Sequence, residues 1–304
     1  MSGQAPTRLL AAIDVGPLAL SEADRACGFG ARLVARVPWM DDAGAPADAA
    51  YVRARGERGL AADAPTDLSR ALTAMSTAAA AGVVVLMRPW DPRTGALAWE
   101  GEVSATVGWP AVPAAFEGAW IDAAGRLARA SGAEVIVGPI ATREGLDALA
   151  AHPHLKGLTS PIRLLVDDVW DLSRGLVPGW RPATPFGSAG DRAALVAAIR
   201  EGRIGLMTEH QPVPWHRLDG PRATVPGGFA ALVSAWPLSV RAVGVEAAQR
   251  GWRHLEHVCP NADTFDWDPA GVTVPGPDGA SEVFAGERLS GAVVRNAGSE
   301  APPG

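Results

Sequence analysis

The chain has 304 residues, of which 48% are hydrophobic and 20% charged, a composition typical of a soluble globular protein with one large domain or two smaller ones. Its net charge of −6 argues against a nucleic-acid-binding surface, since such surfaces concentrate lysine and arginine on one face. Cys27 and Cys259 form neither a disulfide framework nor a CxxC metal motif, and the most apolar window, residues 71–87, contains too many polar interruptions for a membrane span. We therefore expect a cytoplasmic protein that binds neither nucleic acid nor membranes.

Short apolar segments typical of buried parallel strands alternate along the chain with alanine-rich segments typical of helices. About seven such units favour a (β/α) barrel over a doubly wound sheet, with a long helix after residue 228 closing the barrel. The sequence predicts strands at residues 9–15, 31–37, 51–55, 83–87, 134–137, 158–165 and 204–208, and helices at 21–27, 67–81, 121–130, 143–150 and 191–200.

The tail from residue 263 changes to glycine- and proline-rich sequence with short alternating segments. Such a pattern predicts β-structure beside the barrel, followed by a frayed end. We therefore divide the chain into a barrel over residues 1–260 and, over residues 261–304, a β-rich flanking segment with a disordered C-terminal tail.

The segment from Phe186 to Val213 carries the most informative motif. It reads F-G-S-A-G-D-R-A-A-L, continues through a predicted helix into I-G-L-M-T, and ends in E-H-Q-P-V. This order resembles the dihydroorotase family, in which a P-P-L-R-S-x-x-D-R-x-A-L segment leads to a last barrel strand ending in T-D-H-A-P-H. In this alignment Glu209 takes the place of the family's catalytic aspartate, and His210 follows it.

Two further blocks resemble the same family in the same order along the chain. Residues 99–113 are similar to its N-E-G-x-x-S-x-x-L-G-x-x-G-x-P segment, and residues 282–294 to the return strand of its small β-sandwich. The resemblance implies an α/β fold, namely a truncated TIM-type (β/α) barrel of about seven to eight strands with a small C-terminal β-sandwich remnant.

The resemblance also implies where metal ligands belong, and this sequence lacks them. Gly16 and Leu18 stand in place of the H-x-H pair of the first strand, and Ile136 in place of the histidine of the sixth strand. Arg88 occupies the fifth-strand histidine position, where a cation opposes metal binding. Only Glu209 keeps the character of a ligand, so we expect a degenerate site that holds no metal and needs no cofactor.

The carbamylated lysine that many family members use has no candidate in this chain. We expect the fourth-strand block to be deleted between Gly59 and Thr66, and the only lysine, Lys156, comes much later in the sequence.

Other histidines offer weaker alternatives. His152 and His154 form the only H-x-H motif, but they follow a helix and precede a strand, which places them at the N-terminal rim of a barrel, opposite to the usual active site. His254 and His257, with Glu256, have helical spacing that suits zinc, yet no third ligand is near in the sequence. A structural role is favoured for both groups.

Arg88 and Glu209 suggest a more specific arrangement, because both should point into the barrel mouth. We expect them to form an ion pair that replaces the metal as a tie across the barrel. The vestigial site of Glu209, His210 and Arg88, with His216 nearby, is also the place where any altered acid-base chemistry would occur. Several tryptophans near predicted loop ends either fill the mouth or belong to the ordinary core: Trp39, Trp90, Trp109 and Trp215.

These observations favour a catalytically inactive dihydroorotase homologue that acts as a structural or assembly subunit. The resemblance implies pyrimidine biosynthesis and a partner, the catalytic subunit of aspartate carbamoyltransferase, with a homo-oligomer as a further possibility. The alternatives are a metal-independent or altered amidohydrolase-type hydrolase acting on a cyclic amide or related small molecule, and a binding module that kept the pocket without turnover.

Overall fold

The structure of the chain is a computed structural model, which describes most of the central part of the sequence. The described residues are 59–64, 67–82, 84–174, 181–209, 220–228 and 235–254, together with the short strands at 7–8, 13–15, 34–36, 264–267, 272–273, 288–289 and 294–296.

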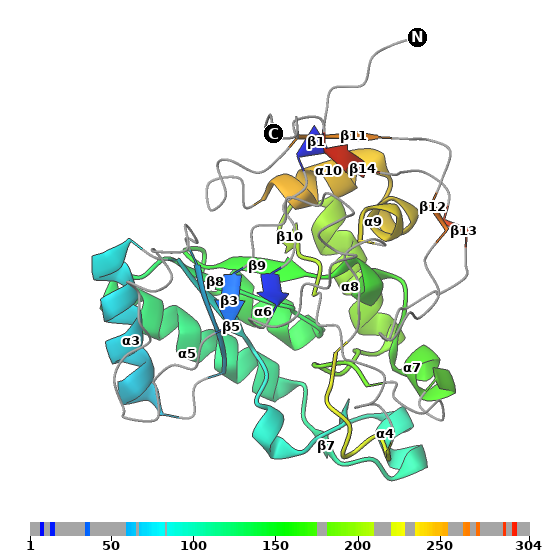
Figure 1. The fold of residues 1–304 in the computed structure, drawn as a ribbon. Helices are drawn as coiled ribbons and strands as arrows, with labels where there is room; N and C mark the ends of the chain where they lie inside the picture. Colours follow the sequence, from blue (N-terminus) through cyan, green and yellow to red (C-terminus); the bar gives the residue numbers. More distant parts are fainter. Residues whose placement is uncertain are drawn as a thin grey trace, which may run out of the picture.

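Seven parallel strands form the central sheet, and they lie in the order in which they occur in the chain (Figure 1). A doubly wound sheet would reverse its strand order at a switch point, whereas a consecutive order is that of a singly wound barrel. The predicted α/β fold with a truncated barrel is therefore confirmed. The strands are β2 (Ile13–Val15), β3 (Val34–Arg36), β4 (Gly59–Asp63), β5 (Val84–Arg88), β8 (Val135–Val137), β9 (Lys156–Thr159) and β10 (Gly205–Leu206).

Helices connect the strands and contact one another in chain order on the outside of the sheet (Figure 1). Two short strands pair with each other outside the main sheet, and two 3₁₀ turns occur in the connections. The helices are α3 (Leu68–Ala81), α4 (Glu102–Val107), α5 (Ala115–Ser131), α6 (Arg143–Ala150), α7 (Asp168–Arg174), α8 (Ala189–Arg200), α9 (Ala235–Val243) and α10 (Val245–Arg253); the turns are η1 (Pro92–Thr94) and η2 (Pro161–Leu164), and the outer strands are β6 (Ala98–Trp99) and β7 (Ala111–Val112).

Side-chain caps fix where three of these helices begin. Asp67 accepts a hydrogen bond from the backbone N–H of Arg70 at the start of α3, and Thr142 accepts one from Gly145 at the start of α6. Ser188 begins α8 with a capping box, in which its hydroxyl accepts from the N–H of Asp191 and the Asp191 carboxylate accepts from the N–H of Ser188. Each cap satisfies backbone donors that the first helical turn leaves free, so these start positions are set locally.

The core lies between the sheet and the surrounding helices. All five residues of β5 and all three of β8 are buried, as continuous apolar runs in parallel strands predict. From the helices, Met75 of α3, Ile121 of α5 and Ile199 of α8 pack into the same cluster with no exposed side-chain surface. This continuous core holds the carboxyl ends of the strands in fixed positions.

The segment that follows Gly59 contains β4, which pairs with β3 and β5; the expected strand at 51–55 lies outside the described residues, and the expected deletion of a fourth-strand block stays a prediction. Two other local expectations are wrong. The apolar run from Leu158 to Leu165 is a strand only to Thr159, because Pro161 begins the 3₁₀ turn η2. The single closing helix is two helices, α9 and α10, separated at Gly244, whose φ of 86° leaves the helical region.

A smaller sheet lies beside the barrel. Its order is β1 (Thr7–Arg8), β11 (Thr264–Trp267) and β14 (Val294–Asn296), all antiparallel, and β12 (Val272–Thr273) pairs with β13 (Arg288–Leu289). The tail thus contains the expected β-structure, and the first strand of the chain joins it. The rest of the predicted tail lies outside the described residues. Within the described helices, none combines the length and apolar character that a membrane-spanning helix needs.

Candidate functional site

The carboxyl ends of three parallel strands bring polar side chains together at one edge of the sheet. Arg88 is the last residue of β5, Ser160 directly follows β9, and Glu209 lies three residues beyond β10. All three are buried, with at most 6% of their surface exposed. The carboxyl-terminal edge is where barrel proteins assemble their active sites, so we call this group the mouth cluster, and it includes Arg163 of η2.

The Glu209 carboxylate has three hydrogen-bond donors. Arg163 donates from Nε to Oε2 at 2.8 Å and from Nη2 to Oε1 at 2.6 Å, and the Ser160 hydroxyl donates to Oε2 at 2.6 Å. The backbone of Glu209 has a φ of 51°, in the left-handed region that a non-glycine residue rarely adopts. A two-pronged ion pair holds the residue there, which accounts for its unusual backbone conformation.

Arg163 is bound on every side. Besides Glu209, its guanidinium donates to the carbonyl oxygens of Pro185 at 2.7 Å and Thr184 at 2.8 Å, and it lies 5.0 Å from the centre of the Phe186 ring. Its side chain is 1% exposed and that of Glu209 is 2% exposed. Sequence analysis did not single out Arg163, because the residues that fix it lie from 21 to 46 positions away along the chain.

Arg88 completes the electrostatics of the mouth cluster. Burial lowers the pKa of Arg88 to about 10, while the negative charge of Glu209 raises it and the positive charge of Arg163 lowers it. Arg88 is therefore close enough to Glu209 to respond to its charge, and it stays charged at neutral pH; the direct ion pair expected from the sequence stays a prediction. The two-pronged partner of Glu209, however, is Arg163, so the carboxylate lies in the field of two cations.

The described positions do not fit a metal ion. Arg88 is a buried cation where a ligand is needed, and Ile136 in the middle of β8 has only an apolar side chain. Glu209 already gives both carboxylate oxygens to Arg163 and Ser160. Gly16, Leu18 and His210 lie outside the described residues, and among the described ones no group of three or more histidine, cysteine, aspartate or glutamate side chains is arranged to hold a metal.

The H-x-H motif lies at the opposite edge of the sheet, in the loop between α6 and β9, as the sequence predicted. His152 Nε2 donates to Asp122 Oδ1 at 2.8 Å, and His154 Nε2 donates to the carbonyl oxygen of Gly125 at 2.8 Å. The two rings meet edge to face at 5.7 Å. Both histidines therefore attach this loop to α5.

His254, at the C-terminal end of α10, packs against β10. A Cβ added to Gly205 of β10 would lie 2.5 Å from the Cβ of His254. Glu256, His257 and His216 lie outside the described residues.

A buried cluster of tryptophans lies beside the mouth cluster. Trp90, just beyond β5, is 1% exposed and contacts Trp99 edge to face at 5.1 Å and Trp120 at 6.2 Å. The indole N–H of Trp99 donates to the Pro185 carbonyl at 3.2 Å, the same oxygen that Arg163 uses. The Pro185 carbonyl thus links the tryptophan cluster to the Arg163–Glu209 ion pair. Trp39 and Trp215 lie outside the described residues.

A second layer of contacts covers this side of the sheet. Arg222, in the segment after β10, forms a two-pronged ion pair with Asp171 of α7 and lies 4.3 Å from the centre of the Trp109 ring. The side chains of Arg222 and Asp171 are 8% and 4% exposed. Three segments that are distant in sequence are therefore joined near the mouth.

Glu117 of α5 is a further buried charge that sequence analysis missed. Its carboxylate accepts from the backbone N–H groups of Ala141 and Thr142 at 2.8 and 2.7 Å, and from the Thr142 hydroxyl. Burial raises the pKa of Glu117 to about 7, although these hydrogen bonds act to lower it. The carboxylate caps the start of α6, which explains an acid inside the core as a structural group.

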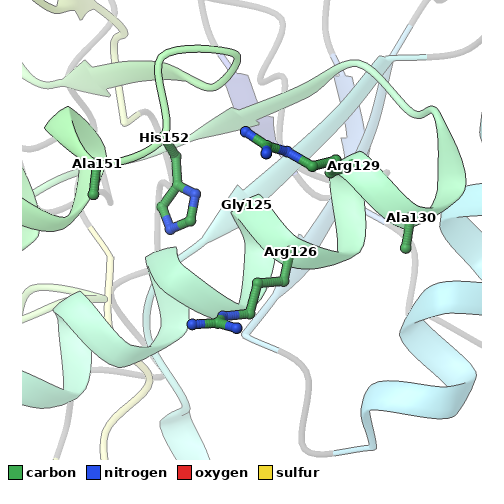
Figure 2. A pocket seen from close by; sticks show the side chains of 6 residues that line it. All are labelled: Gly125, Arg126, Arg129, Ala130, Ala151 and His152. Carbon is green, nitrogen blue, oxygen red and sulfur yellow. The ribbon is translucent and has the colours of Figure 1, made fainter.

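Two pockets of similar size differ in charge. One of about 700 Å³ is lined by the first turns of α4, α6, α7 and α8, and the ionisable side chains around it are five acids and Arg143. The other, of about 520 Å³, is lined by Gly125, Arg126, Arg129, Ala130, Ala151 and His152 (Figure 2).

Comparison with known proteins shows a similarity in sequence to one dihydroorotase and in fold to several solved structures. No protein-family model matches the chain. Over 173 residues it is 29% identical to a dihydroorotase from Brevibacillus brevis, a match that covers 54% of this chain and 40% of that protein. The matched region is thus well under two thirds of the relative's length.

Solved structures agree on the fold. The D-hydantoinase from a Bacillus species, strain AR9, superposes with a TM-score of 0.70 at 13% identity, covering 95% of this chain and 83% of that one. The L-hydantoinase from Arthrobacter aurescens gives 0.65 at 15% identity, covering 86% and 67%. The dihydroorotase from Campylobacter jejuni gives 0.59 at 12% identity, covering 86% and 77%.

Proposed function

We propose that this homologue of dihydroorotase, which has the fold of the hydantoinases and dihydroorotases, is catalytically inactive and acts as a structural or assembly subunit in pyrimidine biosynthesis. The observation that carries the proposal is the internal ion pair of Glu209 with Arg163 at the mouth of the barrel. The partner follows from the resemblance to metal-deficient dihydroorotase-like subunits that hold aspartate carbamoyltransferase together.

The ion pair supports loss of metal chemistry. For Glu209 to bind a metal ion, its carboxylate would have to leave Arg163 and Ser160, and Arg163 would remain as a buried cation without its counter-charge. Breaking a buried pair in this way costs about 3–5 kcal/mol. Arg88 adds a second positive charge beside Glu209, which would repel a divalent cation.

The same contacts argue against Glu209 as a general base. A base has to reach the proton that it removes, directly or through one water molecule. Glu209 is 2% exposed, and three donors engage its carboxylate oxygens. Because Glu209 is bound to Arg163 and Ser160, a structural role for the mouth cluster is better supported than catalysis by an altered hydrolase.

Association with the transferase tests the assembly role. We would mix the full chain with the catalytic subunit of aspartate carbamoyltransferase from the same source and measure the mass by size-exclusion chromatography with light scattering. The D-hydantoinase of Bacillus sp. AR9, which shares the fold, is the control for nonspecific association. A complex of fixed stoichiometry with this chain alone is the expected result. Separate elution at concentrations well above those in the cell contradicts the role.

Turnover tests the competing hydrolase. Dihydroorotate and hydantoin are the appropriate probes, each assayed with the wild-type chain and with the Glu209→Gln variant. Our proposal expects no hydrolysis in either. Hydrolysis by the wild type that disappears in the variant would establish altered amidohydrolase chemistry at the mouth cluster.

A further inference from the structure

The smaller pocket lies at the opposite end of the barrel from the mouth cluster. Its walls come from the second half of α5 and from Ala151 and His152, which lie between the end of α6 and the start of β9 (Figure 2). That position is the amino-terminal edge of the sheet. Its lining residues are therefore separate from the degenerate metal positions.

Two arginines supply the charge of this pocket. Arg126 and Arg129 are three residues apart on α5, so both project from one face of the helix, and both are exposed. In the part of the chain that the structure describes, neither guanidinium has a hydrogen-bond or ion-pair partner. Like charges at this spacing repel each other, so a bound anion would relieve the repulsion.

Several other arginines of the described segments are paired within the protein. Arg163 and Arg222 are paired with carboxylates in the interior, and Arg203 is paired with Glu201 on the surface. The two exposed, unpaired arginines on one face of α5, beside a pocket without acidic lining residues, thus distinguish this edge among the described segments.

His152 forms the wall that faces the two arginines in Figure 2. Its ring is held by Asp122 and lies directly on Gly125, where a Cβ would come within 2.4 Å of the ring atoms. Gly125 and Ala130 present no bulky side chain, so the space between the imidazole and the guanidinium groups stays open. None of the residues that line the pocket is acidic, in contrast to the larger pocket.

We propose that this pocket binds an oxyanion, a phosphate or carboxylate group, through the guanidinium groups of Arg126 and Arg129. Planar guanidinium groups match the geometry of both anions with paired hydrogen bonds. A volume of about 520 Å³ holds more than a single phosphate group, so the anion can belong to a larger molecule. The anion has two conceivable sources, a free small molecule or an acidic side chain of a partner protein.

The first arm of the test is independent of the assembly role. Inorganic phosphate is titrated into the full chain by isothermal calorimetry at constant ionic strength. We expect saturable binding that weakens about tenfold in Arg126→Gln and in Arg129→Gln, the loss that removal of a charge-assisted hydrogen bond predicts. The matched control is Arg143→Gln, which removes an exposed arginine from the other pocket and should change the affinity by less than about twofold.

All three substitutions are on exposed side chains, so each variant should fold, and circular dichroism checks this. Absence of saturable binding to the wild type would overturn the proposal. Equal weakening in all three variants would also overturn it, because it would mean general charge attraction.

The second arm separates the two sources. The complex with the transferase is measured with and without saturating phosphate, and with the Arg126→Glu/Arg129→Glu variant. If phosphate and the variant both weaken the complex, the anion is an acidic side chain of the partner. If phosphate binds and the complex is unchanged, or if no complex forms at all, the site serves a free small molecule. A missing complex therefore refutes the assembly role and leaves the oxyanion site standing.

Discussion

The two ends of helix α5 carry charge in opposite ways. Near its start, Glu117 is fully buried, and its carboxylate is satisfied by the first residues of α6. Toward its end, Arg126 and Arg129 are exposed and have no partner among the described residues. The first end lies on the side of the sheet where barrel proteins carry their active sites, and the second on the side where conservation generally serves stability.

The buried charges of the mouth cluster resemble Glu117 more than they resemble the two exposed arginines. Arg163 and Glu209, like Glu117, are buried and saturated with hydrogen bonds. Arg126 and Arg129, at the other edge, are exposed and remain available to an external partner. We therefore expect substitutions in the mouth cluster to change the stability of the protein. Substitutions in the pocket lined by Arg126 and Arg129, which we call the arginine pocket, should change the binding of oxyanions.

The largest expected effect is at Arg163. In Arg163→Ala the Glu209 carboxylate loses its two-pronged partner inside the protein, which should lower the free energy of unfolding by about 3–5 kcal/mol. Urea denaturation measures the change. The control is Arg203→Ala, which breaks an exposed pair with Glu201 and should cost less than about 1 kcal/mol. Equal costs would mean that the mouth pair is not a structural centre.

Glu117 gives the next effect, which depends on pH. Its pKa rises from an ordinary value of 4.5 to about 7 in the folded protein, so the folded state holds a proton that the unfolded state releases at lower pH. The contribution to stability is therefore present below about pH 4.5 and is lost as the pH rises to about 7, a loss on the order of 3 kcal/mol.

The Glu117→Gln variant should lack this pH dependence. Denaturation of both proteins at several values between pH 4.5 and 8 gives the difference between them, in which the titration of all other groups cancels. A difference that stays constant over this range would contradict a raised pKa. Glutamine has one acceptor oxygen where the carboxylate has two, so it cannot accept all of the hydrogen bonds from Ala141 and Thr142. We therefore expect a further decrease in the free energy of unfolding that does not vary with pH.

Gly125 tests the packing of the arginine pocket. Gly125→Ala places a methyl group within 2.4 Å of the His152 ring, so His152 must move, at a cost of about 1–3 kcal/mol that outweighs the better helix propensity of alanine. Gly190→Ala in α8 is the matched control, because its Cβ meets only the Ser188 hydroxyl at 3.6 Å. A thermal melt should show a lower midpoint for the first variant only.

The smallest expected effect on stability is at the free arginines. Arg126→Gln and Arg129→Gln remove no internal contact, so each should change the free energy of unfolding by less than about 0.5 kcal/mol. Urea denaturation of these variants and of Arg163→Ala under the same conditions compares their free energies of unfolding directly. A loss approaching that of Arg163→Ala would mean that this edge is also structural.

Local signals in the sequence predicted much of the fold. Helix α6 spans residues 143–150 as expected, and α3 begins one residue after its capping Asp67. The failures also have local causes. β4 carries the small residues Gly59, Ala61 and Ala62 and so lacks the branched side chains that identify a strand.

The sequence predicted the candidate site only in part, because local signals place a residue along a strand or loop but do not identify its distant partners. Position along the strands placed Arg88 and Glu209 at the mouth, and loop position placed the H-x-H motif at the opposite rim. Arg163 was missed because its role depends on tertiary contacts with Glu209, 46 residues away, and with carbonyl groups of the segment before α8. The sequence pattern carries no information on such pairs.

The most direct test of the central claim is the metal content of the purified full chain, measured by inductively coupled plasma mass spectrometry, with dihydroorotate hydrolysis assayed on the same sample with added zinc. A mouth held by Arg163 and Glu209 predicts far less than one equivalent of metal and no turnover. A full equivalent of zinc together with hydrolysis would contradict the account.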